Sequence, residues 1–237
     1  MRINKFLSEA GVCSRRAADR EILAGRVSIN GRTAVPGDRV TDADEVCFCG
    51  RPVKRKEEIL LYAYYKPRGV VCTESRKEER NLFQELSLSE RVTYMGRLDK
   101  DSEGLLVLTN RGDLIELGMR GSRAHEKEYV VRIDREVTPE LIRFLSQGVY
   151  LSELDRTTRP CRVKKLSRYT FSMVLTEGLN RQIRRMCEAA GVRVRALKRI
   201  RVINILLSDM KSGELRSIEG EEREEFFRII GWKNTKS

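Results

Sequence analysis

ILLYAYY, at residues 59–65, is the first of five apolar runs that decide the fold of this 237-residue chain. The other four are GVVC at 69–72, LLVLT at 105–109, YVVRI at 129–133 and FSMVLT at 171–176. Their length and their β-branched and aromatic content predict buried strands. Helices are predicted between them, one capped by Thr138 with Pro139 in its first turn and one from Asn180 to Ala190. This spacing predicts an α+β domain with a mainly antiparallel, mixed sheet over residues 59–230.

Residues 1–50 come before this region and have the pattern of a small domain of helices and short strands. The apolar residues of the first ten positions share one helical face: Ile3, Phe6, Leu7 and Ala10. A second helix is predicted from Ser14, as its N-cap, to Gly25. The dipeptide at 30–31 is Asn-Gly, a strong signal for a type I′ hairpin, and another short strand is predicted around 46–48. Two helices are therefore expected to precede every strand.

The segment between the two regions is RPVKRKEE, residues 51–58, with six charges and a proline but no apolar periodicity. Such a composition is typical of a linker. We therefore expect a domain boundary there, and a tail at residues 231–237.

The composition favours a polyanionic partner. Lys and Arg number 47 against 35 Asp and Glu, a net charge of +12, which points to nucleic acid unless the excess is spread evenly over the surface. The chain shows neither a signal-peptide run at its start nor about 20 consecutive apolar residues, so a cytoplasmic protein without membrane association is expected. Six scattered cysteines and one histidine predict reduced thiols and neither a metal site nor a histidine-based triad.

The basic residues cluster in two places. Arg15, Arg16 and Arg20 fall on the second predicted helix and could meet a phosphate backbone, although interleaved acids also fit an ordinary solvated face. The second cluster, between residues 178 and 203, opposes eight basic residues to Glu188 alone. Its members are Arg181, Arg184, Arg185, Arg193, Arg195, Lys198, Arg199 and Arg201. Binding of RNA to such a stripe would depend steeply on salt.

An acidic loop, GRLDKDSEG at residues 96–104, lies just before the run LLVLT. The positions of Asp99, Asp101 and Glu103 match the first half of a calcium loop, but position twelve would be Asn110 and no helix is predicted before the loop. A polar turn between strands is the simpler alternative. In a strongly basic protein, however, a carboxylate close to RNA phosphates is costly unless it has a cationic partner or takes part in chemistry, and this cost favours a site.

These motifs resemble those of a known family. GRLDKDSEGLLVLTN at 96–110, YYKPRG at 64–69, HEKEY at 125–129 and EGLNRQIRRMCE at 177–188 are similar to the bacterial ribosomal-RNA pseudouridine synthases of the RsuA/RluF type. The first 50 residues resemble the ribosomal protein S-four (alpha-L) RNA-binding domain that these enzymes carry. The resemblance extends from Arg2 to about Phe227 and favours the RluF branch, which modifies large-subunit ribosomal RNA and, in some members, a tyrosine tRNA.

The resemblance implies a reaction and its site residues. A uridine would lose its glycosidic bond, turn, and rejoin the sugar through carbon five, without cofactor or metal. Asp99 matches the catalytic carboxylate, acting either as nucleophile or as base on a sugar proton, and Arg184 matches its basic partner. Tyr129 matches the tyrosine that stacks on the flipped base, although an isolated tyrosine there would more often be core packing.

Other residues match the family as RNA contacts. Arg97 would fill the gap left by the flipped base, and Lys66, with Pro67, belongs to a motif beside the active site that also fits a simple strand end. Arg181 and Arg185 would contact phosphates. Leu179 departs from the Arg or Lys that many relatives carry, which removes one possible phosphate contact.

Two alternatives stay open on the sequence alone. One is a non-catalytic RNA-binding or ribosome-assembly factor, in which Asp99 is a turn residue. The other keeps the chemistry but acts on tRNA or small-subunit ribosomal RNA, because the target depends on RNA shape. A monomer is the default expectation.

Overall fold

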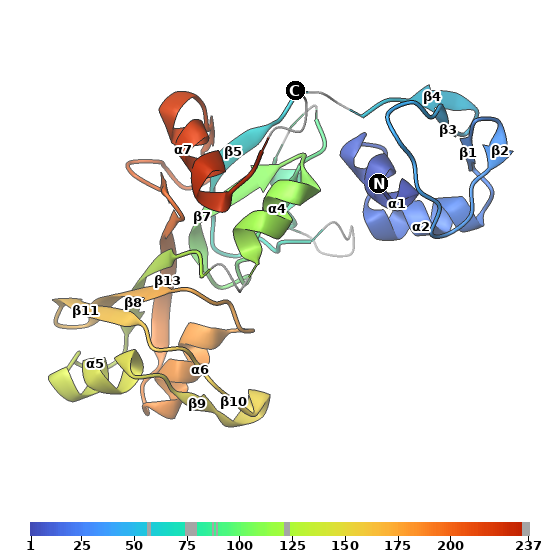
Figure 1. Ribbon diagram of the computed structural model, residues 1–237. Helices are drawn as coiled ribbons and strands as arrows, with labels where there is room; N and C mark the ends of the chain where they lie inside the picture. Colours follow the sequence, from blue (N-terminus) through green and yellow to red (C-terminus); the bar gives the residue numbers. More distant parts are fainter. Residues whose placement is uncertain (56–57, 74–79, 87, 89, 121–123, 234–237) are drawn as a thin grey trace. The chain divides into compact units, whose positions relative to one another are not determined.

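The computed structural model describes residues 1–55, 58–73, 80–86, 88, 90–120 and 124–233. These residues form two compact units, one built mainly from the first 60 residues with 88–93 and 109–113, the other from the rest of the chain. Figure 1 shows the elements along the chain. Within these ranges, no helix is both long and apolar enough to cross a membrane.

The first unit combines two helices with a four-stranded sheet. Helices α1 (Ile3–Glu9) and α2 (Arg15–Leu23) come first, as predicted, and Ser14 caps α2 by accepting a hydrogen bond from the Ala17 amide at 3.3 Å. The strands are β1 (Val27–Ile29), β2 (Arg32–Thr33), β3 (Val46–Phe48) and β4 (Arg51–Val53), in the order β2-β1-β3-β4. The apolar faces of both helices and the sheet form one core.

The predicted hairpin is confirmed in detail. Ile29 pairs with Arg32, so two residues make the turn, and Asn30 and Gly31 both have the positive φ of a type I′ turn, 49° and 80°. Strand β4 lies inside the segment 51–58 that was expected as a linker, because Val53 pairs with Val46. The regular structure of this unit therefore extends at least to Val53.

The second unit is built on a nine-stranded sheet. Its main path runs β11-β12-β8-β13-β7-β5-β15, with β14 and β6 beside it. These strands are β5 (Leu61–Lys66), β6 (Thr93–Met95), β7 (Glu103–Thr109), β8 (Lys127–Ile133), β11 (Arg162–Ser167), β12 (Thr170–Leu175), β13 (Val194–Val202), β14 (Ile205–Leu206) and β15 (Leu215–Ser217). The pairs of β8 with β12 and β13 are antiparallel, whereas β13 and β7 are parallel. The α+β fold with a mixed, mainly antiparallel sheet is therefore confirmed.

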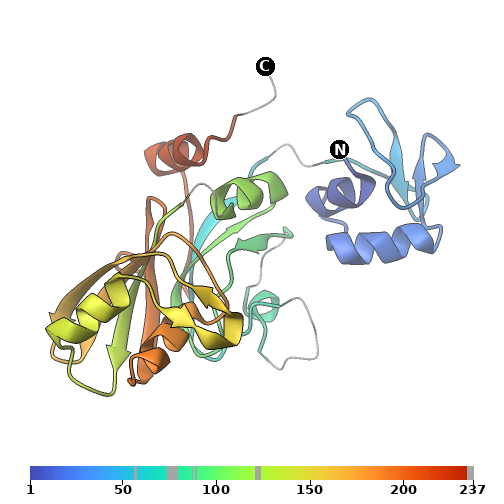
Figure 2. The same cartoon turned by 60° about the horizontal axis from the view of Figure 1, so that its bottom comes forward.

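Helices cover this sheet in two places. Helices α5 (Pro139–Ser146) and α6 (Gln182–Ala189) pack on β8, β12 and β13, as Figures 1 and 2 show. Helices α4 (Gly112–Met119) and α7 (Gly220–Ile230) lie toward β5 and β7. The smaller elements are α3 (Leu82–Glu85), β9 (Tyr150–Leu151), a 3₁₀ turn (Ser152–Leu154) and β10 (Arg156–Thr157).

Four of the five apolar runs contain strands, and one does not. The run GVVC at 69–72 was expected as a strand, yet only Val71 forms an isolated bridge, to Asn81. Gly69 has a φ of +91° and its amide donates to the Lys100 carbonyl at 2.8 Å. The run therefore turns beside the acidic loop instead of extending the sheet, and Val70 and Cys72 are buried there without forming strand pairs.

Candidate active site

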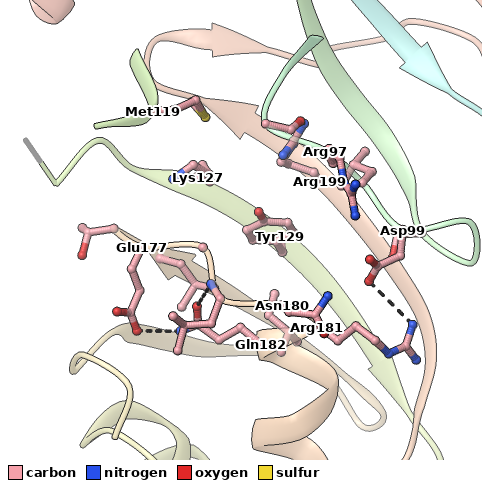
Figure 3. A pocket seen from close by; sticks show the side chains of 18 of the residues that line it. Arg97, Asp99, Met119, Lys127, Tyr129, Glu177, Asn180, Arg181, Gln182 and Arg199 are labelled. Carbon is pink, nitrogen blue, oxygen red and sulfur yellow. Dashed lines mark hydrogen bonds and ion pairs between the residues drawn. The ribbon is translucent and has the colours of Figure 1, made fainter. Parts of the chain in front are cut away.

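A cavity of about 620 Å³ opens in the second unit, where β8 and β13 pass below the acidic loop and the start of α6. Figure 3 shows it from close by. Two carboxylates, Asp99 and Glu177, line it among the described residues. The lysines and arginines that line it are Arg97, Arg120, Lys127, Arg156, Arg159, Arg181, Arg184 and Arg199. Such an excess of positive charge in a hollow suits a polyanion.

The acidic loop presents Asp99 to this cavity. Leu98 is buried and anchors the loop, whereas Arg97 is exposed and Asp99 half-buried. The Ser102 amide donates to the Asp99 carbonyl at 3.1 Å, which closes a tight turn. The carboxylate therefore sits on a short, internally bonded turn and reaches into the cavity.

Lys66 and Arg184 stabilise the turn that carries Asp99 by hydrogen bonds to its backbone carbonyl oxygens. The Lys66 ammonium donates to the carbonyls of Ser102 at 2.9 Å and Pro67 at 2.8 Å. The Arg184 guanidinium donates to the Asp101 carbonyl at 3.1 Å and to the Ser102 hydroxyl at 3.5 Å. Because Lys66 is fully buried, desolvation lowers its pKa, and the two carbonyl oxygens offset part of the cost of burying the charge.

Arg199 ties the two ends of the loop together. Its side chain is only 2% exposed, and its guanidinium donates to the carbonyls of Leu105 at 2.7 Å and Gly96 at 3.2 Å. The Leu105 carbonyl belongs to β7 and Gly96 begins the acidic loop, so one side chain from β13 sets the loop's entry and exit. We refer to Lys66, Arg184 and Arg199 as the inner cations.

Gly104 allows β7 and β13 to approach closely at the loop's exit. It has a φ of +107°, and a Cβ atom there would lie 2.3 Å from the Arg199 carbonyl oxygen. Only glycine fits both conditions. The last residue of the acidic loop thus fixes the loop against the strand that carries Arg199.

Asp99 forms its ion pair with Arg181, not with Arg184. The Arg181 guanidinium lies 3.8 Å from Asp99 Oδ2, whereas Arg184 is engaged with the backbone of residue 101. The expectation that Arg184 pairs with the carboxylate is therefore corrected for this structure. Arg181 comes closer because it is the N-cap of α6, in the left-handed region at φ 52°, and extends from the helix end. Arg184 lies one turn further on and is partly buried.

Tyr129 and Lys127 form part of the cavity floor. Both belong to β8, and residues two apart on a strand project from the same face. Val131 and Ile133 follow on that face and enter the apolar core under α5 and α6. The ring of Tyr129 is therefore supported by packed apolar side chains below and open to the cavity above, as an aromatic platform requires.

Glu177 organises the far wall. Its Oε1 accepts hydrogen bonds from the Arg159 amide at 2.9 Å and from Gln182 Nε2 at 2.8 Å, and Gln182 in turn accepts from the Leu179 amide at 3.0 Å. The side chains of Arg156 and Arg159 extend past its Oε2 at 4.0 Å and 3.9 Å. This buried carboxylate thus holds two half-exposed arginines at the rim of the cavity.

Several predicted RNA contacts are placed differently by the structure. Lys66 is fully buried behind the acidic loop, so the expectation of a direct RNA contact is wrong for this side chain. Arg185 is ion-paired with Glu153 and does not line the cavity, although Arg97 and Arg181 do. Arg15, Arg16 and Arg20 are exposed on α2 of the first unit, as predicted.

The stripe predicted between 178 and 203 is not one free basic face. Arg201 pairs with Glu126 and Glu128 at 3.0 and 3.1 Å, and Arg199 is buried. Lys198 lies 4.0 Å from Glu103 and 5.3 Å from the centre of the Tyr65 ring. Acids far away in the sequence neutralise residues that look unopposed locally.

Sequence reasoning missed the roles of Lys127, Glu177, Gln182 and Arg199. The first three stand inside motifs already singled out, HEKEY and EGLNRQIRRMCE. The spacing of two between Lys127 and Tyr129 was a usable signal, because it places both side chains on one face of a strand. Arg199 offered no such signal, since only the parallel pairing of β13 with β7 brings it under the acidic loop.

Comparison with known proteins matches this architecture to two family models. The model of RNA pseudouridylate synthase matches residues 61–189, which include the acidic loop, Tyr129 and all of α6. The model of the S4 domain matches residues 1–46. The chain is therefore defined as an RNA-modifying enzyme with an S4 domain at its N-terminus.

Curated relatives and a solved structure agree with these matches. The dual-specificity RNA pseudouridine synthase RluF of Escherichia coli K12 is 44% identical over 97% of this chain and 79% of the relative. The ribosomal large subunit pseudouridine synthase B of Bacillus subtilis is 35% identical over 93% of each chain. A crystal structure of a pseudouridylate synthase superposes with a TM-score of 0.71 at 25% identity, covering 97% of this chain and 99% of that one. The chain belongs to the RNA pseudouridine synthase family, and its substrate is RNA.

Proposed function

We propose that this enzyme converts a uridine of large-subunit ribosomal RNA to pseudouridine, with Asp99 as its catalytic carboxylate. The observation that carries the proposal is that Asp99 and Tyr129, from segments 30 residues apart, line one cavity rich in positive charge. A uridine flipped out of its RNA could stack on Tyr129 with its sugar toward Asp99. The names of the relatives, which include large-subunit enzymes, support this class of RNA.

In the proposed reaction Asp99 acts at the sugar. Its carboxylate either attacks C1′ or removes a sugar proton, and the electron pair of the C1′–N1 bond passes to the uracil ring. The ring turns in the cavity and carbon five bonds to C1′, which releases the Asp99 carboxylate in the first route or returns the proton to the sugar in the second. The proton then leaves carbon five, and N1 takes up a proton. Arg181, 3.8 Å from the carboxylate, orients it, and Arg184 fixes the turn that carries it.

The remaining cations would hold the RNA. Arg97, exposed at the cavity mouth, would occupy the place that the flipped nucleotide leaves in its stack. Arg156 and Arg159 would contact the phosphates beside it. Arg15, Arg16 and Arg20, on the exposed side of α2, would grip the same RNA through the S4 domain.

We further propose a first domain whose end moves from residue 50 to Val53, a catalytic domain of 59–230 and a tail of 231–237. This division is supported by the pairing of β4 with β3 in the first unit's sheet and by the end of α7 at Ile230. A monomer acting in the cytoplasm, where bacterial ribosomal RNA is processed, fits this proposal. The resemblance to the RluF branch makes tRNA the second candidate substrate for the same site, and the RluF relatives are named as dual-specificity RNA enzymes.

Tritium release from uridine labelled at carbon five tests the proposal. Wild-type enzyme is expected to release tritium from unmodified large-subunit RNA, and Asp99→Asn to release none while binding that RNA at least as tightly. Asp101→Asn is the matched control: it removes the same charge two residues away, where the side chain is exposed and outside the cavity lining. It should keep its activity within a few-fold.

Other outcomes lead to other conclusions. Release by Asp99→Asn at the wild-type rate would remove the catalytic role from Asp99. Release from tRNA or small-subunit RNA alone would retain the chemistry and change the substrate. Tight binding with no release from any of the three RNAs would favour a binding factor.

A further inference from the structure

We propose that Lys127 binds the edge of the uracil ring stacked on Tyr129 and stabilises the negative charge that the ring carries after its glycosidic bond breaks. This inference rests on the proposed function, because it requires a uracil in the cavity of Asp99 and Tyr129. It assigns a specificity-determining and electrostatic role to a residue of the floor, separate from the carboxylate that acts on the sugar.

The position of Lys127 fits such a contact. Two residues along a strand span about 6.6 Å, which is comparable to the width of a pyrimidine ring with its carbonyl oxygens. Lys127 and Tyr129 face the cavity together, and Figure 3 shows Tyr129 between Lys127 on one side and Asp99 on the other. A ring on Tyr129 would therefore meet a carboxylate at its sugar side and an ammonium at its opposite edge.

Glu128, the residue between Lys127 and Tyr129, shows that side chains of β8 alternate between the two faces of the sheet at this point. Glu128 projects from the other face of β8, where its carboxylate pairs with Arg201 at 3.1 Å. Glu126, two residues earlier, pairs with Arg201 at 3.0 Å on that same face. The two acids of the HEKEY motif are thus directed away from the cavity, and Lys127 meets the ring without a neighbouring carboxylate of its own strand.

The reaction creates a charge that this ammonium can stabilise. When the C1′–N1 bond breaks, both electrons pass to the uracil, which becomes an anion with its charge spread over N1 and the two carbonyl oxygens. When carbon five later bonds to C1′ the ring becomes neutral, and it stays neutral as carbon five loses its proton and N1 takes one up. A cation at the ring edge therefore interacts more strongly with the intermediate than with substrate or product, and this difference accelerates the reaction.

Lys127 is available for this role in the structure. Its ammonium donates to the His125 carbonyl at 3.4 Å, and within the described residues no carboxylate lies within 4.0 Å of it. The charged groups that share this part of the cavity are Arg199 from β13, Glu177 after β12, Arg120 after α4 and His125. Burial and the charge of Arg199 lower the pKa of Lys127 to about 8. A uracil anion beside the ammonium would raise the pKa of Lys127 again, because an opposite charge favours the protonated form.

Two other roles for Lys127 fit the contacts less well. As a structural partner of Glu177 it would be redundant, because Glu177 already accepts from Gln182 and the Arg159 amide and lies 3.9–4.0 Å from two arginines. As a phosphate contact it would be expected at the rim with an exposed head, like Arg156 and Arg159. Lys127 instead lies on the floor, partly buried, beside the stacking ring.

Single-turnover kinetics of Lys127→Met test the proposal. The rate constant at saturating enzyme should fall about 100-fold or more, whereas the dissociation constant for RNA should change by less than about threefold. Lys164→Met is the matched control, because it removes a lysine from the exposed edge strand β11, and its rate should equal that of wild type. Lys127→Arg should recover part of the rate, since the charge is retained.

The pH dependence supplies a readout that a packing role would not change. For wild type, kcat/KM should fall as pH rises through about 8, where Lys127 of the free enzyme loses its proton. In Lys127→Arg this alkaline fall should move to higher pH, and in Lys127→Met it should disappear from the remaining activity.

The unaltered enzyme can also be tested with 2-thiouridine or 4-thiouridine at the target site, because sulfur accepts hydrogen bonds weakly. One of these two thiouridine substrates should lower the single-turnover rate of wild type. The same substrate should lower the already reduced rate of Lys127→Met only slightly further.

Each contrary outcome is distinct. Lys127→Met with the wild-type rate and pH profile would overturn the proposal, and a loss of RNA affinity at an unchanged rate would make Lys127 a phosphate contact. Asp99→Asn measured in parallel separates this inference from the proposed function. If Asp99→Asn is inactive and Lys127→Met is fully active, only the present inference fails, whereas an active Asp99→Asn overturns the proposed function.

Discussion

The inner cations and the cations at the cavity rim are the same residue types, but they differ in burial and in the groups that they contact. Lys66, Arg184 and Arg199 direct their charged groups at backbone carbonyls of the acidic loop and of Leu105 just after it, at distances of 2.7–3.2 Å. The rim cations, Arg97, Arg156, Arg159 and Arg181, are exposed or half-exposed, and three of them lie 3.8–4.0 Å from a carboxylate. The inner set determines where Asp99 is placed, and the rim set is accessible to RNA from the cavity and the solvent.

The energies of these contacts explain the division. A half-exposed ion pair near 4 Å contributes about 0–1 kcal/mol, so a phosphate can replace its carboxylate at little cost. A hydrogen bond from a buried charge to a carbonyl contributes about 1.5–3 kcal/mol, and losing the donor also strands the acceptor. The inner cations are therefore structural, whereas the rim cations are exchangeable.

Replacing Gly104 should disturb the inner set most strongly. In Gly104→Ala the new Cβ would clash with the Arg199 carbonyl at 2.3 Å in a backbone conformation that alanine avoids, so β7 and β13 must separate. We expect the free energy of unfolding to fall by more than about 3 kcal/mol, measured by urea denaturation. Gly213→Ala is the matched control, because its φ is +88° but no atom lies within 4 Å, and it should cost about 1 kcal/mol. Equal effects would mean that the contact between the strands is unimportant.

Removing the guanidinium of Arg199 should be the next largest effect. Arg199→Met leaves the carbonyls of Gly96 and Leu105 without their donor, at a cost of about 2–4 kcal/mol in stability. The single-turnover rate should fall at least tenfold, because Asp99 loses its fixed position, with RNA affinity nearly unchanged. A variant that loses affinity but keeps its rate would move Arg199 to the rim set.

Lys127 makes stability depend on pH in a definite direction. Because its pKa is about 8 in the folded chain against 10.5 as its ordinary value, the unfolded chain binds more protons between these limits. Wild type should therefore gain stability as pH rises from 8 to 10, relative to Lys127→Met, by on the order of 2 kcal/mol. Thermal unfolding of both proteins across this range checks the sign. If the difference in stability between wild type and Lys127→Met were the same at every pH, Lys127 would be in a solvated environment.

Arg181 and Arg185, four residues apart, should show the smallest difference in RNA binding among these comparisons. Arg181→Gln should weaken RNA binding about 5- to 10-fold and reduce the slope of log affinity against log salt by about one, because it removes a cavity-lining charge. Arg185→Gln should change affinity less than about twofold, since Glu153 already neutralises Arg185. Titrations at several salt concentrations distinguish them, and equal salt slopes would contradict the division.

Local sequence signals predicted local structure well. The Asn30–Gly31 turn, the Ser14 cap and the Thr138 cap all appear as expected, because each depends on a few neighbouring residues. The run GVVC failed as a strand because apolar content predicts burial, which it has, but not ladder pairing, which depends on distant segments.

The candidate site was predictable in its members more than in their contacts. Asp99, Tyr129, Arg97 and Arg181 do line one cavity. Lys66 and Arg184 were expected to face RNA and the carboxylate, yet both bind the loop's backbone. A sequence shows where a positive charge is, but whether it meets a carbonyl, an acid or a ligand is decided by residues brought close only by the fold.

The packing of Gly104 against the Arg199 backbone has a consequence for redesign. Since that contact joins main chain to main chain, the placement of the acidic loop depends little on which side chains occupy the rim. An engineer who wants a new RNA target can therefore randomise positions 97, 156 and 159 as an independent library. The position of Asp99, and with it the chemistry at the sugar, should be retained by every member that still folds and still flips its target nucleotide.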